Sequence, residues 1–271
     1  QEAAQNTSKT ITASLEKLST GFRINKASDD ASGLAIADKL RTQATSISQG
    51  ISNGNSAVSL LQIADKSMGE QSNILDTVKA KLIQANTATT SADGRESIRK
   101  DIDKLLTQLD NIAGQTNYNG TYLLQSAAGS AGNAASTALV FQVGEKSADT
   151  ITNEAVRSNT TGLGLTTLSG LAASGLTASV AGTQQTTVDA AITTLNGYRG
   201  NIGSTQNQVE SAVRNLMTQA TNVKAAESII RDVDYAQESA NFNKQNIISQ
   251  AGSYAISQAN AVQQNVLRLL Q

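Results

Sequence analysis

The chain has 271 residues, a formal net charge of −1, and 39% hydrophobic but only 3% aromatic residues, with no cysteine, histidine, proline or tryptophan. Without cysteine and histidine there can be no disulfide framework, no Ser-His-Asp triad and no thiolate or imidazole zinc site. The near-neutral charge argues against nucleic-acid binding, which requires a basic face. The composition therefore points away from an enzyme, and we expect no catalytic residue, cofactor or metal.

Membrane and secretory signals are also missing from the sequence. No stretch approaches the roughly 18 consecutive apolar residues of a membrane span, so we expect no membrane insertion. No charged segment followed by an apolar one opens the chain, as it would in a cleaved secretory signal. Because Gln1 is not a methionine, we expect the native N-terminus to lie ahead of it.

The apolar residues are mostly small or aliphatic, which suits narrow helix–helix contacts better than a thick globular core. The absence of proline also favours long helices. The alternative is disorder, which a polar chain with few aromatics often adopts. Periodicity of the apolar residues decides between the two.

The first predicted element covers residues 3–18, which offer only Ala4, Ile11, Leu15 and Leu18 as apolar side chains. This is too little for a helix that is stable alone. A seven-residue register then predicts one long helix, with Gly54 as its single gap. The register is formed by Leu40, Ile47, Leu61, Met68, Leu75 and Leu82.

Residues 97–113 carry apolar side chains at alternating spacings of four and three, which predicts a third helix. Ser91 precedes it as a cap residue, and Gly114 follows as a stop. Residues 117–120 (NYNG) are typical of a turn. Residues 138–143 and 149–156 read as two strands of a hairpin joined by a turn at 144–148.

Residues 158–188 contain no charged side chain and five glycines, so we expect an irregular or β-rich exposed connection. A second seven-residue register follows without a break and predicts another long helix. Its members are Val188, Leu195, Ile202, Val209, Leu216, Val223 and Ile230. The final segment, 239–267, has Lys244 as its only charge and predicts a helix that serves as an assembly surface.

The motifs that suggest chemistry are weak. Asp29 and Asp30 are adjacent and so would not face each other on a helix, and they suit a helix start better than an acid–base pair. Gly162-Leu-Gly164 begins like a dinucleotide fingerprint but has threonine at 167. The acidic residues of 97–113 alternate with basic ones, as on a solvated helix face.

Four segments resemble bacterial flagellins closely. They are 18–37 (LSTGFRINKASDDASGLAIA), 115–124 (QTNYNGTYLL) with 141–144 (FQVG), 226–236 (AESIIRDVDYA) and 261–271 (AVQQNVLRLLQ). The resemblance covers the chain except about 158–186. It implies a mainly α fold, an elongated antiparallel helical bundle or coiled coil with a small β-hairpin region, in which the two chain ends pair.

The resemblance also implies a division of the chain into inner and outer core parts. The expected parts are 1–27 and 232–271 as the inner core, 28–157 and 187–231 as the outer core, and 158–186 as a short uncharged variable connection. Expected subunit-interface residues are Leu15, Leu18, Arg23, Ile24, Asn25, Asp29, Asp30, Ala255, Ala259, Val262, Val266 and Leu269.

A flagellin polymerises into the flagellar filament for motility, so the resemblance implies other flagellin subunits, the flagellar export apparatus, an export chaperone and a cap protein as partners, and a secreted, extracellular location. Thr77 and Lys81 stand where flagellins detected by a host innate-immune receptor carry Arg and Leu. These departures put receptor recognition in doubt and fit flagellins of the epsilon group of proteobacteria.

Two rival functions remain. A hook–filament junction protein shares the terminal signatures. A flagellin-like enzyme with a metalloprotease insert would need histidine ligands, which the chain lacks.

Overall fold

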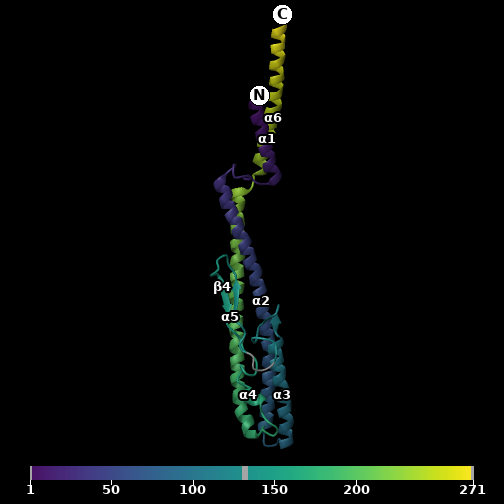
Figure 1. The fold of residues 1–271 in the computed structure, drawn as a ribbon, viewed down its shortest axis with the longest axis vertical. Helices are drawn as coiled ribbons and strands as arrows, with labels where there is room; N and C mark the ends of the chain where they lie inside the picture. The colour runs from purple at the N-terminus through teal and green to yellow at the C-terminus, as the bar shows by residue number, and fades with distance from the viewer. Residues whose placement is uncertain (1, 130–133, 270–271) are drawn as a thin grey trace. The chain divides into compact units, whose positions relative to one another are not determined.

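The computed structural model describes residues 2–129 and 134–269, and side chains through residue 263 (Figure 1). The fold is mainly α, as the sequence predicts. The helices are α1 (Glu2–Thr20), α2 (Ala31–Asn86), α3 (Ala92–Gln115), α4 (Thr166–Ser169), α5 (Ala178–Arg231) and α6 (Tyr235–Leu269). The strands are β1 (Asn117–Tyr118), β2 (Thr121–Tyr122), β3 (Leu139–Gln142) and β4 (Thr150–Asn153).

Contacts divide the chain into two compact units. A terminal unit comprises residues 1–46 and 218–271, and a central unit comprises residues 47–217. Helices α2 and α5 each contribute residues to both units, and the terminal unit combines two stretches that are far apart in the sequence.

In the central unit α2 and α5 run antiparallel, because positions later in α2 meet positions earlier in α5. Two of the paired positions form ion pairs, Asp65–Arg199 at 2.9 Å and Lys79–Asp189 at 2.5 Å. The paired positions are Gly54 with Val213, Asp65 with Arg199, Lys79 with Asp189, and Asn86 with Gly182.

Both seven-residue registers are confirmed as the buried seams of these helices. The central members are buried, whereas Leu40, Val223 and Ile230 are half-buried. Each fully buried Leu, Ile or Met stabilises the fold by about 1.5–3 kcal/mol relative to exposure. The buried members are Ile47, Leu61, Met68, Leu75, Leu82, Val188, Leu195, Ile202, Val209 and Leu216.

Gly54 interrupts the first register because the facing helix fills its place. A Cβ atom at Gly54 would lie 2.4 Å from Val213 Cγ2, which is closer than van der Waals contact allows. The gap in the sequence pattern therefore marks a close approach of α5 to α2.

Helix α3 is longer than predicted. Ser91 caps it as expected, with its Oγ accepting a bond from the Gly94 main-chain N–H at 3.1 Å. The expectation that Gly114 stops the helix is wrong, because α3 continues to Gln115. Gly114 instead allows a close main-chain contact, since a Cβ there would lie 2.1 Å from the Gly129 carbonyl oxygen.

Two short hairpins follow α3. Strands β1 and β2 pair antiparallel around Asn119 and Gly120, which both have positive φ, at 50° and 81°. The predicted hairpin of 138–143 and 149–156 is confirmed, although its strands β3 and β4 are shorter than predicted. The Asn53 side-chain amide donates to the Gln142 carbonyl at 3.1 Å and so ties this hairpin to α2.

The expectation that 158–188 forms an exposed, irregular connection is only partly right. Residues 158–165 and 170–177 are irregular, as expected. However, Ser158, Asn159 and Thr160 are fully buried, and α5 begins at Ala178. Asp110 of α3 holds this turn by accepting bonds from Thr160 N–H at 2.7 Å and Thr160 Oγ1 at 2.9 Å. Apolar anchors complete the segment: Leu163, Leu165, Leu168 and Leu176 are all buried.

Candidate assembly surface

The described residues offer little for catalysis or metal binding. No group of three or more acidic side chains in the described parts of the chain could hold a metal ion. None of the helices in these ranges carries an apolar stretch sufficient for a bilayer crossing.

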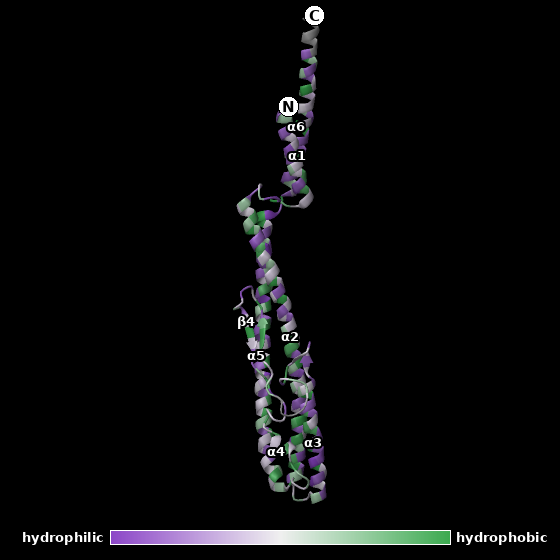
Figure 2. Ribbon diagram, in the orientation of Figure 1, coloured by the Kyte–Doolittle hydropathy of each residue, from purple (hydrophilic) through white to green (hydrophobic). Residues whose placement is uncertain are grey.

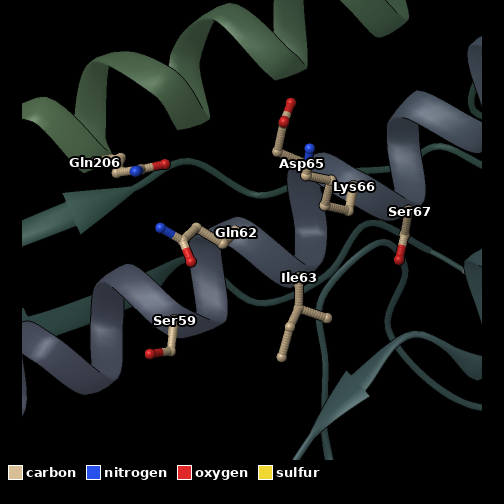
Figure 3. A pocket seen from close by; sticks show the side chains of 7 residues that line it. All are labelled: Ser59, Gln62, Ile63, Asp65, Lys66, Ser67 and Gln206. Carbon is tan, nitrogen blue, oxygen red and sulfur yellow. The ribbon is translucent and has the colours of Figure 1, made fainter.

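The hollow in Figure 3 lies between α2 and α5 of the central unit. Its only carboxylate, Asp65, is paired with Arg199, and the other lining side chains include neither a nucleophile–base pair nor a second acid. The lining residues are Ser59, Gln62, Ile63, Asp65, Lys66, Ser67 and Gln206.

The terminal unit consists of an N-terminal segment, 1–46, and a C-terminal segment, 218–271, and main-chain bonds join the two where α1 ends and α6 begins. Phe22 and Asp232 form an isolated antiparallel β-bridge, with Arg23 N–H donating to the Arg231 carbonyl at 2.6 Å. The Arg231 guanidinium lies 4.2 Å from the centroid of the Phe22 ring, which adds a cation–π contact. The Arg23 guanidinium donates to the Ile230 carbonyl at 2.8 Å. These bonds hold the N-terminal and C-terminal segments of the terminal unit together.

Asp30 caps α2, as predicted, whereas Asp29 bonds to main-chain groups that precede it and not to the start of the helix. Asp30 Oδ1 accepts from Gly33 N–H at 2.9 Å at the start of α2. Asp29 Oδ2 accepts from the main-chain N–H groups of Lys26 at 2.9 Å and Asn25 at 3.0 Å. These two bonds lower the pKa of the Asp29 carboxyl below its usual range. Both acids thus stabilise the turn between α1 and α2.

Helices α1 and α6 pack against each other in antiparallel orientation within the terminal unit (Figure 1). Gly21, with φ of 78°, ends α1 beside the Tyr235 ring at the start of α6. Ser14 Oγ donates to the Glu238 carboxylate, and Ser14 is the only buried residue of α1 among those described. The helix pair therefore buries few apolar side chains within one chain.

Large apolar side chains are instead exposed on this unit. Figure 2 shows hydrophobic residues spread along α6 among hydrophilic ones. Most exposed large apolar residues in the described ranges belong to the terminal unit, although it is the smaller one. They are Leu15, Ile36, Ile229, Tyr235, Ile247, Ile248, Tyr254, Ile256 and Val262.

The structure brings together only part of the predicted interface set. Leu15 is 54% exposed, and Ala255, Ala259 and Val262 are exposed on α6. Leu18 and Asn25 are half-buried, while Arg23, Asp29 and Asp30 are exposed but bonded within the chain as described above. Ile24 is buried at 3% exposure, so its contacts are intrachain. Val266 and Leu269 lie outside the residues whose side chains are described.

Sequence reasoning missed Ile36, Ile229, Ile247 and Ile248 as exposed apolar positions. They do not belong to a seven-residue register, and an isolated Ile in a helix gives no sign of its burial. The Phe22–Asp232 bridge also had no local signal, because its partners are far apart in the sequence.

Antiparallel helices with apolar side chains left exposed on the paired ends of the chain define a helical subunit suited to self-association. Residues 1–129 match the family model for the bacterial flagellin N-terminal helical region, and residues 185–270 match that for the bacterial flagellin C-terminal helical region. The chain belongs to the bacterial flagellin family.

Individual relatives agree with this assignment. A flagellin of Bacillus subtilis (strain 168) is 36% identical over 94% of this chain and 91% of its own length. A 33 kDa flagellar filament core protein of Treponema phagedenis is 31% identical over 100% of this chain and 96% of its own. Flagellin B of Helicobacter pylori (strain ATCC 700392 / 26695) is 50% identical, but over only 42% of this chain and 22% of its own.

A crystal structure of Bacillus cereus flagellin has the same fold. It is 32% identical, with a TM-score of 0.51, and the match covers 65% of this chain and 94% of that one.

Proposed function

We propose that this chain is the structural subunit of a bacterial flagellar filament, and that its terminal unit forms the contacts between subunits. The observation that carries the proposal is the concentration of exposed large apolar residues on the unit that contains α1 and α6. Membership of the flagellin family supports it. The junction-protein alternative is not favoured, because the two relatives described above that match over more than 90% of their length are a flagellin and a flagellar filament core protein.

Assembly would supply the burial that the single chain lacks. Leu15 is 54% exposed and Ile247 is 67% exposed, although α1 and α6 already pack on each other. Burying such a side chain contributes about 1.5–3 kcal/mol. Several of them at one contact offset the entropy of ordering two helices that would be marginal alone. A repeated contact of this kind that does not close into a ring produces a helical filament.

The finer assignments belong to the same proposal. Residues 1–27 and 232–271 form the inner core of the filament, and 28–157 and 187–231 form the outer core. Leu15 and Leu18 with Ala255, Ala259, Val262, Val266 and Leu269 contact neighbouring subunits. Arg23, Ile24, Asn25, Asp29 and Asp30 set the geometry of the turn that positions them.

The proposal extends to export and location. The chain travels unfolded through the flagellar export apparatus with an export chaperone, and adds beneath a cap protein outside the cell. The protein has no enzymatic role. The partial match to Helicobacter pylori flagellin B supports a source in the epsilon group of proteobacteria. Host-receptor recognition is not part of the proposal, because Thr77 and Lys81 depart from the receptor-binding pattern and Lys81 is paired with Asp101 at 2.9 Å.

Two changes test the assembly role. Deletion of residues 239–271 should abolish filaments in electron microscopy while the central helices stay folded by circular dichroism. Ile247→Ser removes one exposed apolar side chain and should weaken polymerisation without lowering monomer stability, because surface changes are usually within about 0.5 kcal/mol. Val140→Ser is the matched control, since Val140 is 61% exposed on β3 of the central unit.

Filaments from the truncated chain would refute the assigned role of α6. Equal polymerisation defects in Ile247→Ser and Val140→Ser would show that the terminal unit has no special part in assembly.

A further inference from the structure

The sequence contains three Asn-Gly pairs, and the fold places them in different surroundings. They are Asn53-Gly54, Asn119-Gly120 and Asn196-Gly197. In such a pair the glycine main-chain nitrogen can attack the side-chain amide carbon of the asparagine, because glycine has no Cβ to obstruct the approach. The attack also needs freedom of the asparagine main chain and a glycine nitrogen that is not held elsewhere.

Asn119 and Gly120 form the two-residue loop between β1 and β2. Both are exposed and both have positive φ, as a type I′ turn requires. Cross-strand pairing joins Tyr118 to Thr121, so the two loop residues lie beyond the paired positions. No atom outside its chain neighbours lies within 4 Å of the position that a Cβ of Gly120 would take. The glycine is therefore open on its exposed side.

The hairpin is short enough to open at its tip. Strands β1 and β2 have two residues each, and a two-stranded hairpin is marginal in water. Its base is anchored, because Leu123 N–H donates to the Thr116 carbonyl at 3.2 Å and both residues are buried. Opening of the tip therefore costs little and leaves the core in place.

The other two pairs are held by helices. Gly54 and Gly197 lie inside α2 and α5, where each main-chain N–H is bonded to the carbonyl four residues earlier. Asn53 is held further, because its Oδ1 accepts from Gln49 Nε2 at 2.9 Å and its Nδ2 donates to the Gln142 carbonyl at 3.1 Å. Asn196 is exposed like Asn119, so these two differ mainly in main-chain conformation.

We propose that Asn119 is a site of spontaneous deamidation, and that it reacts in the folded chain while Asn53 and Asn196 are protected. The nitrogen of Gly120 loses its proton and attacks Cγ of Asn119. A nitrogen–carbon bond forms, the Cγ–Nδ2 bond breaks, and ammonia leaves with the proton. Water then opens the resulting succinimide ring at either carbonyl and gives aspartate or isoaspartate.

Each product adds one negative charge to an exposed turn of a chain whose formal net charge is −1. Aspartate can keep the turn, because Asp, like Asn, tolerates the left-handed region. Isoaspartate carries the main chain through the former side chain and adds one carbon to it, so the geometry of the two-residue turn must change. Deamidation would therefore produce two forms of the chain that differ in the β1–β2 turn.

The test compares the three pairs in one sample. The full chain is incubated in mildly alkaline buffer, then digested, and the aspartate and isoaspartate peptides are quantified by mass spectrometry. Conversion at Asn119 should be about tenfold or more faster than at Asn53 and Asn196, because reaction in a helix requires local opening. The Asn119→Asp variant provides the reference peptide for one product.

A parallel incubation in concentrated guanidinium separates the effect of the fold from that of local sequence. There the three pairs should convert at comparable rates. If Asn196 converts as fast as Asn119 in the folded chain, the helix gives no protection and the proposal fails. If Asn119 stays intact in the folded chain but converts in guanidinium, the turn protects it and the proposal is also overturned.

Discussion

Gly54→Ala is the most direct test of the contact between α2 and α5. Alanine in place of glycine in a helix interior stabilises a helix by about 0.5–1 kcal/mol. At Gly54 the added Cβ would lie 2.4 Å from Val213 Cγ2. Val213 is β-branched and stiff at χ1 in a helix, so it cannot easily turn away. Overpacking of this kind costs about 1–3 kcal/mol, and we expect a net loss of about 1 kcal/mol.

Gly69→Ala is the matched control. Gly69 also lies in the interior of α2, but nothing outside its neighbours is within 4 Å of the position of an added Cβ. This variant should therefore be stabilised by the full difference in helix propensity between alanine and glycine. Because both variants gain that amount, the difference between their free energies of unfolding isolates the packing cost of about 1–3 kcal/mol at Gly54.

The assay is urea unfolding of the dilute monomer followed by far-ultraviolet circular dichroism. In a double-mutant cycle, Val213→Ala should relieve much of the Gly54→Ala defect, with a coupling energy above about 1 kcal/mol. Equal stabilisation by Gly54→Ala and Gly69→Ala would refute the close approach as the reason for the gap in the register.

Two further predictions concern acids of α3 that hold the connection to α5. Bonds from the Arg99 side chain and the Ser174 N–H lower the pKa of Glu96 from 4.5 to about 2. The ionised Glu96 therefore stabilises the folded chain fully above the ordinary pKa of glutamate, and this stabilisation is lost as pH falls toward 2. The urea midpoint of the wild type should exceed that of Glu96→Gln near neutral pH, and the two midpoints should converge in acid. A difference that stays constant with pH would contradict this. Asp110→Ala should lower the free energy of unfolding in urea by about 1–3 kcal/mol, because it leaves buried donors of Thr160 unpaired. A cost below about 0.5 kcal/mol would show that those donors find other partners.

Burial raises the pKa of Asp110, against the lowering effect of its bonds from Thr160. A raised pKa in the folded state means that the part of the stability that depends on ionisation of Asp110 is greatest below its ordinary pKa and declines as pH rises through the raised value. This part is separate from the cost of Asp110→Ala, which removes the acceptor of the Thr160 bonds. The contributions of Glu96 and Asp110 to stability therefore change in opposite directions on acidification.

The sequence predicted the helices whose apolar residues repeat every seven positions, and it predicted the β3–β4 hairpin from its β-branched and aromatic residues. It also predicted the capping role of Asp30, because a cap is a local interaction between residues three apart. These features depend on residues close in the chain, where spacing alone fixes which side chains share a face.

The burial of Ser158, Asn159 and Thr160 was decided by the tertiary structure. A polar segment reads as exposed unless its hydrogen-bond partners are known, and here they come from distant elements. The Asp110 carboxylate of α3 accepts hydrogen bonds from Thr160 N–H and Oγ1, and Gln71 Nε2 of α2 donates to the Ser158 carbonyl at 3.1 Å. Such partners offset the free-energy cost of burying polar groups.

Gly54 also separates what the local sequence pattern determines from what tertiary contacts determine. The sequence alone determined that α2 is a long helix with one gap in its apolar seam, because a single glycine does not end a helix with so strong a period. Only the packing of α5 explained the gap, since the space for a side chain depends on what faces it. For this protein, local periodicity set the helices, and contacts between residues far apart in the chain set which polar groups are buried and where helices approach most closely.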